Sequence, residues 1–171
     1  MEDNIDNNEE KWSIAMHEKY KRFFAIYEGE VTERSYYQKG QILRGIECGQ
    51  GWKWIIERFL ESLEWIEKNR TYDTNPNFDK DAPYGNGNTP SYEVGPPTIK
   101  IFQIKEKFGR LSIYIEEMSD RVRRDVECAI AKAEARAELT CKYCGKLEKD
   151  MKPTKGWVLY ICEECHERTG K

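Results

Sequence analysis

The sequence is poor in histidine and contains no long apolar run. Two histidines among 171 residues leave little material for histidine-based catalysis. No window approaches the roughly 18 consecutive apolar residues that span a bilayer. The chain also lacks a G-x4-G-K-[ST] phosphate loop, an H-E-x-x-H metal motif and a nucleophile elbow. These absences argue against an enzyme of the classes that those motifs define, and against a membrane-spanning protein.

Basic residues are not in excess either. The chain has 28 Lys and Arg residues against 31 Asp and Glu residues, which gives a formal net charge of −3. This balance argues against binding of nucleic-acid phosphates through bulk charge. Residues 1–10 contain acidic side chains and no basic one, so we expect a disordered acidic segment here and no secretory or mitochondrial leader. We therefore expect a cytoplasmic protein.

Four of the six cysteines predict a metal site. They form two C-x2-C pairs separated by seventeen residues, a spacing typical of zinc ribbons. Two such turns, brought together by a hairpin, place four thiolates around one ion, which suits tetrahedral Zn²⁺. Because four thiolates leave no open coordination position, we expect the Zn²⁺ to be structural and not catalytic. The predicted ligands are Cys141, Cys144, Cys162 and Cys165.

Two disulfides are the alternative arrangement for these four cysteines. Disulfides persist in oxidising compartments, and the acidic start of the chain does not predict export, so the zinc site is the favoured interpretation. The remaining cysteines, Cys48 and Cys128, are interpreted as inert thiols. Bound zinc would change the formal charge from −3 to about −5, since four thiolates add −4 and the ion adds +2.

Apolar periodicity predicts three helices. The first carries an aromatic stripe from Trp12 to Tyr27 and ends at Gly29, and the second starts near Gly51. The third follows Ser119, a residue type favoured as a helix N-cap. The expected buried face of the second helix consists of Trp52, Ile55, Ile56, Phe59, Leu60, Leu63 and Ile66. The expected buried face of the third consists of Val122, Val126, Ala129, Ile130, Ala133 and Ala137.

Two alternating runs predict an antiparallel hairpin in which Gly109 takes a positive φ. In the first run we expect one side of the strand to present Ile99, Ile101 and Gln103, and the other side Phe102 and Ile104. Helices and strands are segregated along the chain, so the predicted fold is α+β. It comprises two N-terminal helices, a small antiparallel hairpin sheet, a third helix and a C-terminal zinc-ribbon hairpin.

The chain divides into three parts in this interpretation. Residues 1–10 are the disordered acidic leader, and residues 11–140 form the α+β body. The body contains a long loop at 69–97, rich in proline and asparagine. Residues 141–171 form the zinc ribbon, which follows the third helix with almost no linker and is therefore expected to pack on the body.

Two surfaces of the body are candidates for partner binding. Trp54 and Trp65 lie on the side of the second helix opposite its buried face, where they either bind a partner or are covered by the aromatic-rich 69–97 loop; we favour the covering loop. The hairpin tip is the other candidate, with Lys105, Lys107, Phe108 and Arg110. Basic residues around an aromatic side chain can contact a phosphate or stack on a base, although charged turns are often only solvated.

The lysines between the two cysteine pairs are a third candidate surface. Zinc ribbons with local positive charge bind nucleic acids, and others act as structural staples or protein-docking sites. Here the neighbouring Glu163, Glu164 and Glu167 largely cancel the local positive charge.

Three strings carry a resemblance to a known group. They are Glu47–Trp52 (ECGQGW), Gln103–Leu111 (QIKEKFGRL) and the two cysteine pairs with Gly145 and Gly156-Trp157 between them. Over roughly residues 42–165 the chain resembles a group of small uncharacterised phage and prophage proteins. The resemblance implies a phage-encoded protein in a bacterial host cell, and it marks the hairpin tip and the 47–52 turn as special positions.

The sequence favours a non-enzymatic, zinc-stabilised binding protein. The expected partner is a bacterial host protein, and the expected effect is inhibition of a defence or regulatory factor. A zinc ribbon that binds nucleic acid through the lysines and the hairpin tip is the alternative. A third possibility is capture of a small nucleotide signal between the hairpin and the long loop.

Overall fold

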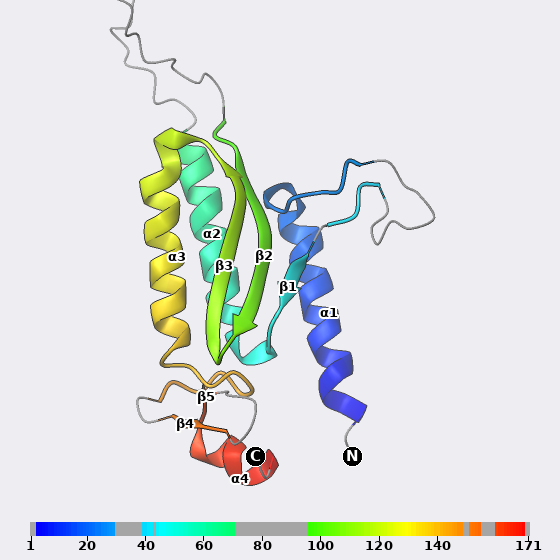
Figure 1. The fold of residues 1–171 in the computed structure, drawn as a ribbon, viewed down its shortest axis with the longest axis vertical. Coiled ribbons are helices and arrows are strands. Elements are labelled where there is room, and N and C mark those ends of the chain that lie inside the picture. Colours follow the sequence, from blue (N-terminus) through cyan, green and yellow to red (C-terminus); the bar gives the residue numbers. More distant parts are fainter. Residues whose placement is uncertain are drawn as a thin grey trace, which may run out of the picture.

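The computed structural model describes residues 3–29, 39–42, 44–70, 96–148, 151–154 and 160–169. Within these ranges the fold is α+β, as predicted, with four α-helices and a three-stranded sheet (Figure 1). The elements in chain order are α1 (Asp3–Tyr20), β1 (Gly45–Glu47), α2 (Lys53–Arg70), β2 (Ile99–Lys107), β3 (Arg110–Met118), α3 (Arg123–Ala137), β4 (Lys152–Pro153), β5 (Tyr160–Ile161) and α4 (Glu163–Thr169). Helices α2 and α3 pack side by side against one face of the β2–β3 hairpin, and α1 lies along β1 (Figure 1).

The sequence predicts neither helix α4 nor strand β1. It pairs in parallel with β2, with Gly45 opposite Gln103, and the sheet order is β1-β2-β3. Strand β1, helix α2 and strand β2 therefore form a parallel crossover unit. The expected segregation of helices and strands is wrong for this part of the chain, because a strand of three residues is too short to give a recognisable alternation.

Strands β2 and β3 form the predicted antiparallel hairpin, with an irregularity in the middle. The pairing register shifts between Ile101 and Gln103, which inserts one residue and reverses the alternation of side chains. As a result Ile101 and Ile104, three residues apart, are both fully buried in the same core. The prediction that Ile104 faces away from Ile101 is wrong for this reason. Gln103 instead donates a hydrogen bond from Nε2 to Oε2 of Glu47 on β1, at 2.7 Å.

The hairpin turn consists of the two residues between the paired Lys107 and Arg110. Both have a positive φ, 52° for Phe108 and 81° for Gly109, which is the requirement of a type I′ turn. The positive φ predicted for Gly109 is confirmed. Phe108 takes the same left-handed conformation at a cost of about 1 kcal/mol, and its side chain is 73% exposed.

Helix α1 begins and ends earlier than predicted. It starts at Asp3, within the segment expected to be disordered, where acidic residues near a helix N-terminus interact favourably with the helix dipole. It ends at Tyr20 and not at Gly29. A short 3₁₀ turn follows, and Phe24 then forms a parallel bridge with Ile101 of β2. The aromatic stripe is buried as far as Phe24, and Tyr27 is half-buried. Its last part is therefore extended chain beside β2 and not helix.

The core lies between the sheet and the three long helices. All seven apolar residues predicted for the second helix are buried. On α3 the predicted stripe is buried or packed against the core. Ser119 does not cap the third helix with its side chain. Its Oγ accepts a hydrogen bond from the backbone N–H of Thr98 at 3.0 Å, and its own N–H donates to the Thr98 carbonyl oxygen at 2.9 Å, so Ser119 ties the two ends of the hairpin together.

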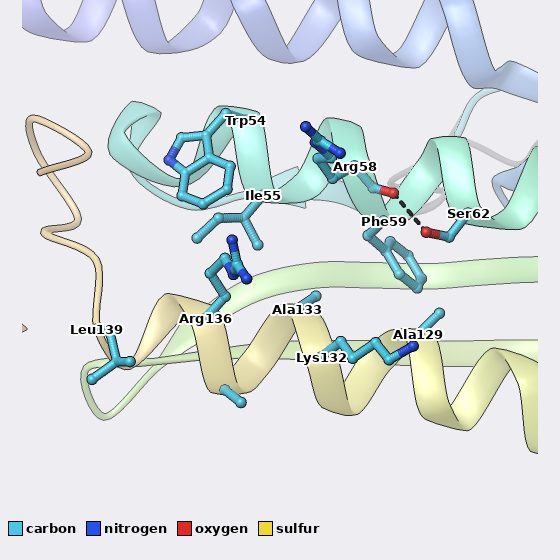
Figure 2. A pocket seen from close by; sticks show the side chains of 11 residues that line it. Trp54, Ile55, Arg58, Phe59, Ser62, Ala129, Lys132, Ala133, Arg136 and Leu139 are labelled. Carbon is cyan, nitrogen blue, oxygen red and sulfur yellow. Dashed lines mark hydrogen bonds between the residues drawn. The ribbon is translucent and has the colours of Figure 1, made fainter. Parts of the chain in front are cut away.

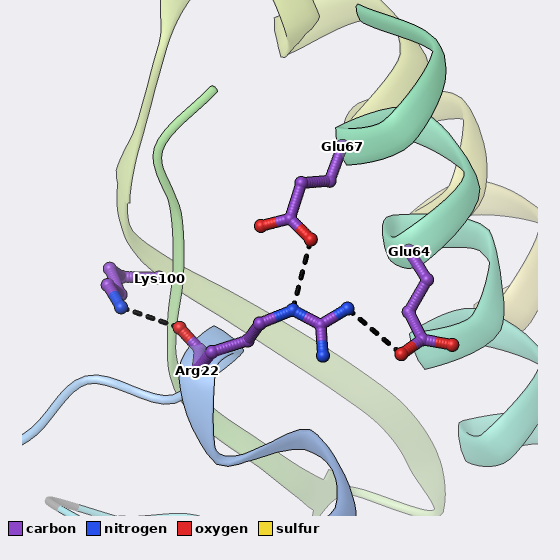
Figure 3. A network of polar contacts seen from close by, with 4 residues as sticks. All are labelled: Arg22, Glu64, Glu67 and Lys100. Carbon is purple, nitrogen blue, oxygen red and sulfur yellow. Dashed lines mark hydrogen bonds and ion pairs between the residues drawn. The ribbon is translucent and has the colours of Figure 1, made fainter. Parts of the chain in front are cut away.

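Ion pairs join the ends of the helices to their neighbours. Figure 3 shows Arg22, directly after α1, donating to Glu64 and Glu67 on α2 at 2.9 and 3.0 Å, while its carbonyl oxygen accepts a hydrogen bond from Lys100 on β2. At the end of α2, Arg70 pairs with Asp125 of α3 at 2.9 Å. Exposed pairs of this kind contribute little energy each, but these contacts fix where the helix ends lie.

His17 of α1 contacts the edge strand β1. Its Nε2 accepts a hydrogen bond from the backbone N–H of Ile46 on β1 at 3.0 Å, and its ring packs edge-to-face on Phe24 with centroids 4.9 Å apart. Nε2 can accept only in the neutral imidazole. Burial lowers the pKa of His17, and the nearby Glu18 carboxylate opposes that shift only in part.

We predict that His17 makes stability depend on pH. Because its pKa is lower in the folded than in the unfolded chain, its contribution is present above pH 6.5 or so and is lost as the pH falls toward the folded-state value. His17→Gln should cost about 1 kcal/mol of unfolding free energy near neutral pH, and this difference should shrink at pH 5. Denaturant unfolding at several pH values measures it. Ile46→Val keeps the backbone N–H that His17 accepts from and removes only part of a buried apolar side chain, so it should give a pH-independent difference; a constant difference for His17→Gln would contradict the prediction.

Candidate metal centre

The four predicted ligands lie together at the C-terminal end of the fold. The Sγ atoms of Cys141, Cys144, Cys162 and Cys165 all lie within 4.8 Å of one another, and all four are free thiols. The sulfurs of Cys144 and Cys162 are 3.5 Å apart. A tetrahedral ion with Zn–S bonds of about 2.3 Å needs sulfurs about 3.8 Å apart, so the cluster has the size of a four-sulfur metal site. The cluster could hold a metal ion, and none of its four cysteines forms a disulfide.

The first cysteine pair sits in a tight turn. The backbone N–H of Cys141 donates to the carbonyl oxygen of Lys146, and the N–H of Gly145 donates to that of Cys141, both at 2.9 Å. Gly145 has φ +77°, a conformation that favours glycine. Thr140 and Leu147 close the turn with an antiparallel bridge. This turn, residues 140–147, is referred to below as the first knuckle.

The second pair follows a short hairpin. Strands β4 and β5 pair with Lys152 opposite Ile161; Cys162 comes directly after β5, and Cys165 lies in the first turn of α4. Strand β5 is the end of the β-prone run Trp157–Ile161, whose first three residues lie outside the described residues. The first cysteine pair therefore comes from a turn, and the second pair comes from the junction between strand β5 and helix α4.

The environment of Cys144 and Cys165 opposes ionisation of their thiols when no ion is bound. Burial raises the pKa of both. At Cys165 contacts with the other cysteine thiols add to this rise, whereas at Cys144 the backbone N–H of Lys146 offsets part of it. Burial also acts on Cys141, but backbone N–H groups of Cys144, Cys162 and Tyr143 point at its sulfur and leave the pKa of Cys141 lowered. A metal ion would supply the positive charge that the other thiolates need, with release of protons.

The first knuckle lies directly on the turn at residues 49–52. The N–H of Gly51 donates to the carbonyl oxygen of Lys142 at 2.8 Å, and the indole Nε1 of Trp52 donates to that of Thr140 at 2.9 Å. A Cβ atom at Gly51 would overlap the carbonyl oxygens of Cys141 and Lys142. The ECGQGW string therefore has a physical role, because only glycine allows the two backbones to come this close.

Glu106 joins the hairpin to the same place. Its Oε1 accepts a hydrogen bond from the backbone N–H of Gly109 at 2.7 Å, and its Oε2 pairs with Nζ of Lys142 at 3.4 Å. The Glu106 side chain is only 8% exposed. Residues from each of the three strings of the resemblance, far apart in sequence, thus meet around the first knuckle: Gly51 and Trp52, Glu106, and Cys141 with its neighbours. Sequence reasoning missed Glu106, because an acidic residue in a charged turn gives no sign of its burial.

The predicted partner-binding residues do not form one surface. At the hairpin tip, the ammonium of Lys105 lies 5.1 Å from the Tyr114 ring centroid, and that of Lys107 lies 5.9 Å from the ring centroid of the exposed Phe108. Arg110 approaches Glu138, the residue after α3, at 3.7 Å. Lys107, Phe108 and Arg110 line a pocket together with Ser112 of β3.

The two tryptophans lie elsewhere, on α2. Trp54 is half-buried beside α3 (Figure 2), and Trp65 is 60% exposed. The covering segment expected from the 69–97 loop falls, for residues 71–95, outside the described residues. That expectation therefore stays a prediction.

Comparisons with protein-family models, with curated proteins and with solved structures found no match to this chain. None of the helices in the described ranges is both long and apolar enough to cross a membrane.

We predict that Gly51→Ala separates the first knuckle from the body. The added Cβ meets backbone atoms that cannot rotate away, so the substitution should cost about 3 kcal/mol of unfolding free energy and speed metal loss to a chelator. Gly40→Ala is the control: nothing lies within 4 Å of its Cβ position, and only its positive φ costs about 1–2 kcal/mol. Denaturant unfolding and chelator competition measure both effects. Wild-type stability and metal retention in Gly51→Ala would disprove the close contact.

Proposed function

We propose that this chain is a non-enzymatic binding protein whose C-terminal part is held by one structural Zn²⁺. The observation that carries the proposal is the closed set of four sulfurs, all within 4.8 Å of one another. Four soft thiolates in a tetrahedral set favour Zn²⁺ over hard cations. The protein fills every coordination position, so the ion has no place for a substrate or an activated water.

The position of the cluster supports a structural role for the ion. The first knuckle contacts the turn before α2 through Gly51 and Trp52, follows the end of α3, and reaches the hairpin through Glu106. An ion that orders the knuckle also orders these three elements relative to one another. Zinc then maintains the exposed surfaces that α2, α3 and the hairpin tip present to a partner.

A bacterial host protein is the proposed partner, and inhibition of a defence or regulatory factor is the proposed effect. The net charge of −3 favours protein over nucleic acid as the partner. Two large side chains, Phe108 and Trp65, are 73% and 60% exposed, and aromatic residues are frequent anchors of protein interfaces. The phage origin comes from the resemblance of the three strings that meet at the knuckle.

Nucleic acid is the alternative partner, and the charges around the knuckle disfavour it. Lys142 pairs with the buried carboxylate of Glu106, and Lys146 lies 4.0 Å from Glu164. These lysines are therefore partly neutralised. Capture of a nucleotide signal between the hairpin and the long loop involves residues 71–95, which lie outside the described residues.

We predict one zinc ion per chain, measured by elemental analysis of purified protein. Cys144→Ser should weaken zinc binding by about tenfold or more and destabilise the C-terminal third, and adding Cys165→Ser should abolish binding. Cys128→Ser is the matched control, because this cysteine lies on the exposed side of α3, outside the cluster. Stoichiometric zinc in the Cys144→Ser/Cys165→Ser variant would contradict the four-cysteine site.

We predict that a host protein co-purifies with the zinc-loaded chain and that DNA and RNA do not bind it at about 150 mM salt. Affinity capture from host lysate, followed by reconstitution with the purified candidate, measures the first part. Fluorescence anisotropy with labelled oligonucleotides measures the second. Tight nucleic-acid binding that falls steeply with salt, without any reconstituted protein complex, would replace this proposal by the alternative.

A further inference from the structure

A groove of about 560 Å³ runs between α2 and α3 on the side away from the sheet (Figure 2). Its floor is apolar: Phe59 of α2 is 2% exposed and Ala133 of α3 is 6% exposed. Trp54 forms one end and is half-buried. The small side chains of α3 are what leave the groove open, because a longer side chain at Ala133 would fill it.

The rims of the groove are cationic on both sides. Arg58 stands on α2, and Lys132 and Arg136 stand on α3; all three are exposed. Figure 2 shows Arg58 and Arg136 on opposite sides of the apolar floor. The guanidinium of Arg136 lies 5.7 Å from the Trp54 ring centroid. Among the described residues, no acidic side chain lines the groove.

These three cations have no carboxylate partner among the described residues, where other cations of the same helices do have one. Arg70 at the end of α2 pairs with Asp125, and Arg123 at the start of α3 pairs with Asp120. The helical spacing explains the concentration of charge, since Lys132 and Arg136 are four residues apart and share one face with Ala129 and Ala133. The groove thus combines an apolar floor with positive charge that the described part of the chain does not neutralise.

We propose that this groove binds an acidic, amphipathic peptide segment of a partner protein. One apolar side chain of the segment lies on Phe59 and Ala133, and carboxylates on either side pair with Arg58, Lys132 and Arg136. Guanidinium groups bind carboxylates through paired hydrogen bonds, and an apolar groove between helices is a common receptor for an amphipathic segment. The α2 part of the groove, Trp54 to Ser62, spans about 12 Å, which matches about two turns of a helix.

A nucleotide fits the same charges less well. Phosphate sites in proteins use converging backbone N–H groups at a helix N-terminus or a glycine-rich turn. Here both helices present their sides, where the backbone N–H groups are already bonded within the helix. The cations also stand on two rims and do not converge on one point. Cations on two opposite rims can instead pair with several carboxylates spaced along one peptide.

The proposal rests on the proposed function for the existence of a protein partner, and adds the chemistry that the partner must have.

Trp65 indicates how the binding surface continues along α2. It lies eleven residues after Trp54, which places it within about 20° of Trp54 around the helix axis, and it is 60% exposed. The segment that fills the groove can therefore contact a second aromatic side chain farther along α2.

The test uses the full, zinc-loaded chain and a fluorescein-labelled peptide of about twelve residues, with leucines on one helical face and glutamates on the other. The matched probe has lysine in place of every glutamate. Measured by anisotropy at about 150 mM salt, the glutamate peptide should bind about tenfold or more tightly than the lysine peptide, and its affinity should fall as salt rises.

Charge reversals locate the binding site. Arg58→Glu and Arg136→Glu should each weaken the glutamate peptide about tenfold, and Arg58→Lys should retain most of the affinity. Arg124→Glu makes the same charge change at an exposed α3 position that does not line the groove, and should change affinity less than about twofold. The substituted side chains are exposed, so the variants should unfold at the wild-type temperature.

Three results would overturn the proposal. One is equal binding of both peptides, or binding unaffected by the groove reversals. Another is an oligonucleotide or nucleoside triphosphate that binds in their place and is lost in Arg58→Glu and Arg136→Glu. The third is peptide binding that occurs only when residues 71–95 are replaced by a Gly-Ser linker, which would make this chain's own segment the occupant.

The outcome is separable from that of the proposed function. If a reconstituted host-protein complex persists unchanged in Arg58→Glu and Arg136→Glu, the groove proposal fails and the proposed function stands. If the glutamate peptide binds with the expected charge dependence but no host-protein complex can be reconstituted, the groove stands and the proposed function fails.

Discussion

The close contact between the Gly51 backbone and the Cys141–Lys142 backbone is the constraint on which the rest of the structure depends. It places the first knuckle on the turn that starts α2, and the knuckle follows directly from the end of α3. The indole of Trp52 continues the contact into the core, where it donates to the carbonyl oxygen of the fully buried Thr140. One end of the helix pair is thus closed by a backbone–backbone hydrogen bond at Gly51 and by the indole hydrogen bond of the buried Trp52.

Through this contact the cysteine cluster is connected to the body of the protein. Glu106 adds the hairpin to the same junction, since its buried carboxylate accepts from Gly109 and pairs with Lys142. A structural ion in the cluster would therefore stabilise the hairpin turn and the α2–α3 pair together. The groove between these helices has one end beside this junction, because Trp54 follows Trp52 by two residues.

The sequence predicted the parts of this fold that depend on side-chain chemistry or long periodicity. The cysteine spacing identified the cluster, the apolar repeat identified the full buried face of α2, and Gly109 identified the turn. The sequence did not predict the local structures that depend on backbone pairing between distant segments. Three residues at Gly45–Glu47 become a strand because β2 lies beside them, and the bulge at Ile101–Gln103 arises from pairing with β3. Ser119 has the composition of a helix cap, yet Thr98 uses its hydroxyl. The cationic groove was missed because its charges come from two helices far apart in the chain.

The anchoring of the segment between α2 and β2 has a consequence for how this architecture can vary. Arg70, the last residue of α2, is held by Asp125, and Thr98, just before β2, is held by Ser119. Both attachments lie near the start of α3, at the end of the molecule opposite the cysteine cluster (Figure 1). Because these contacts hold both ends of the connection, its length can change without altering where α2 ends or where β2 begins.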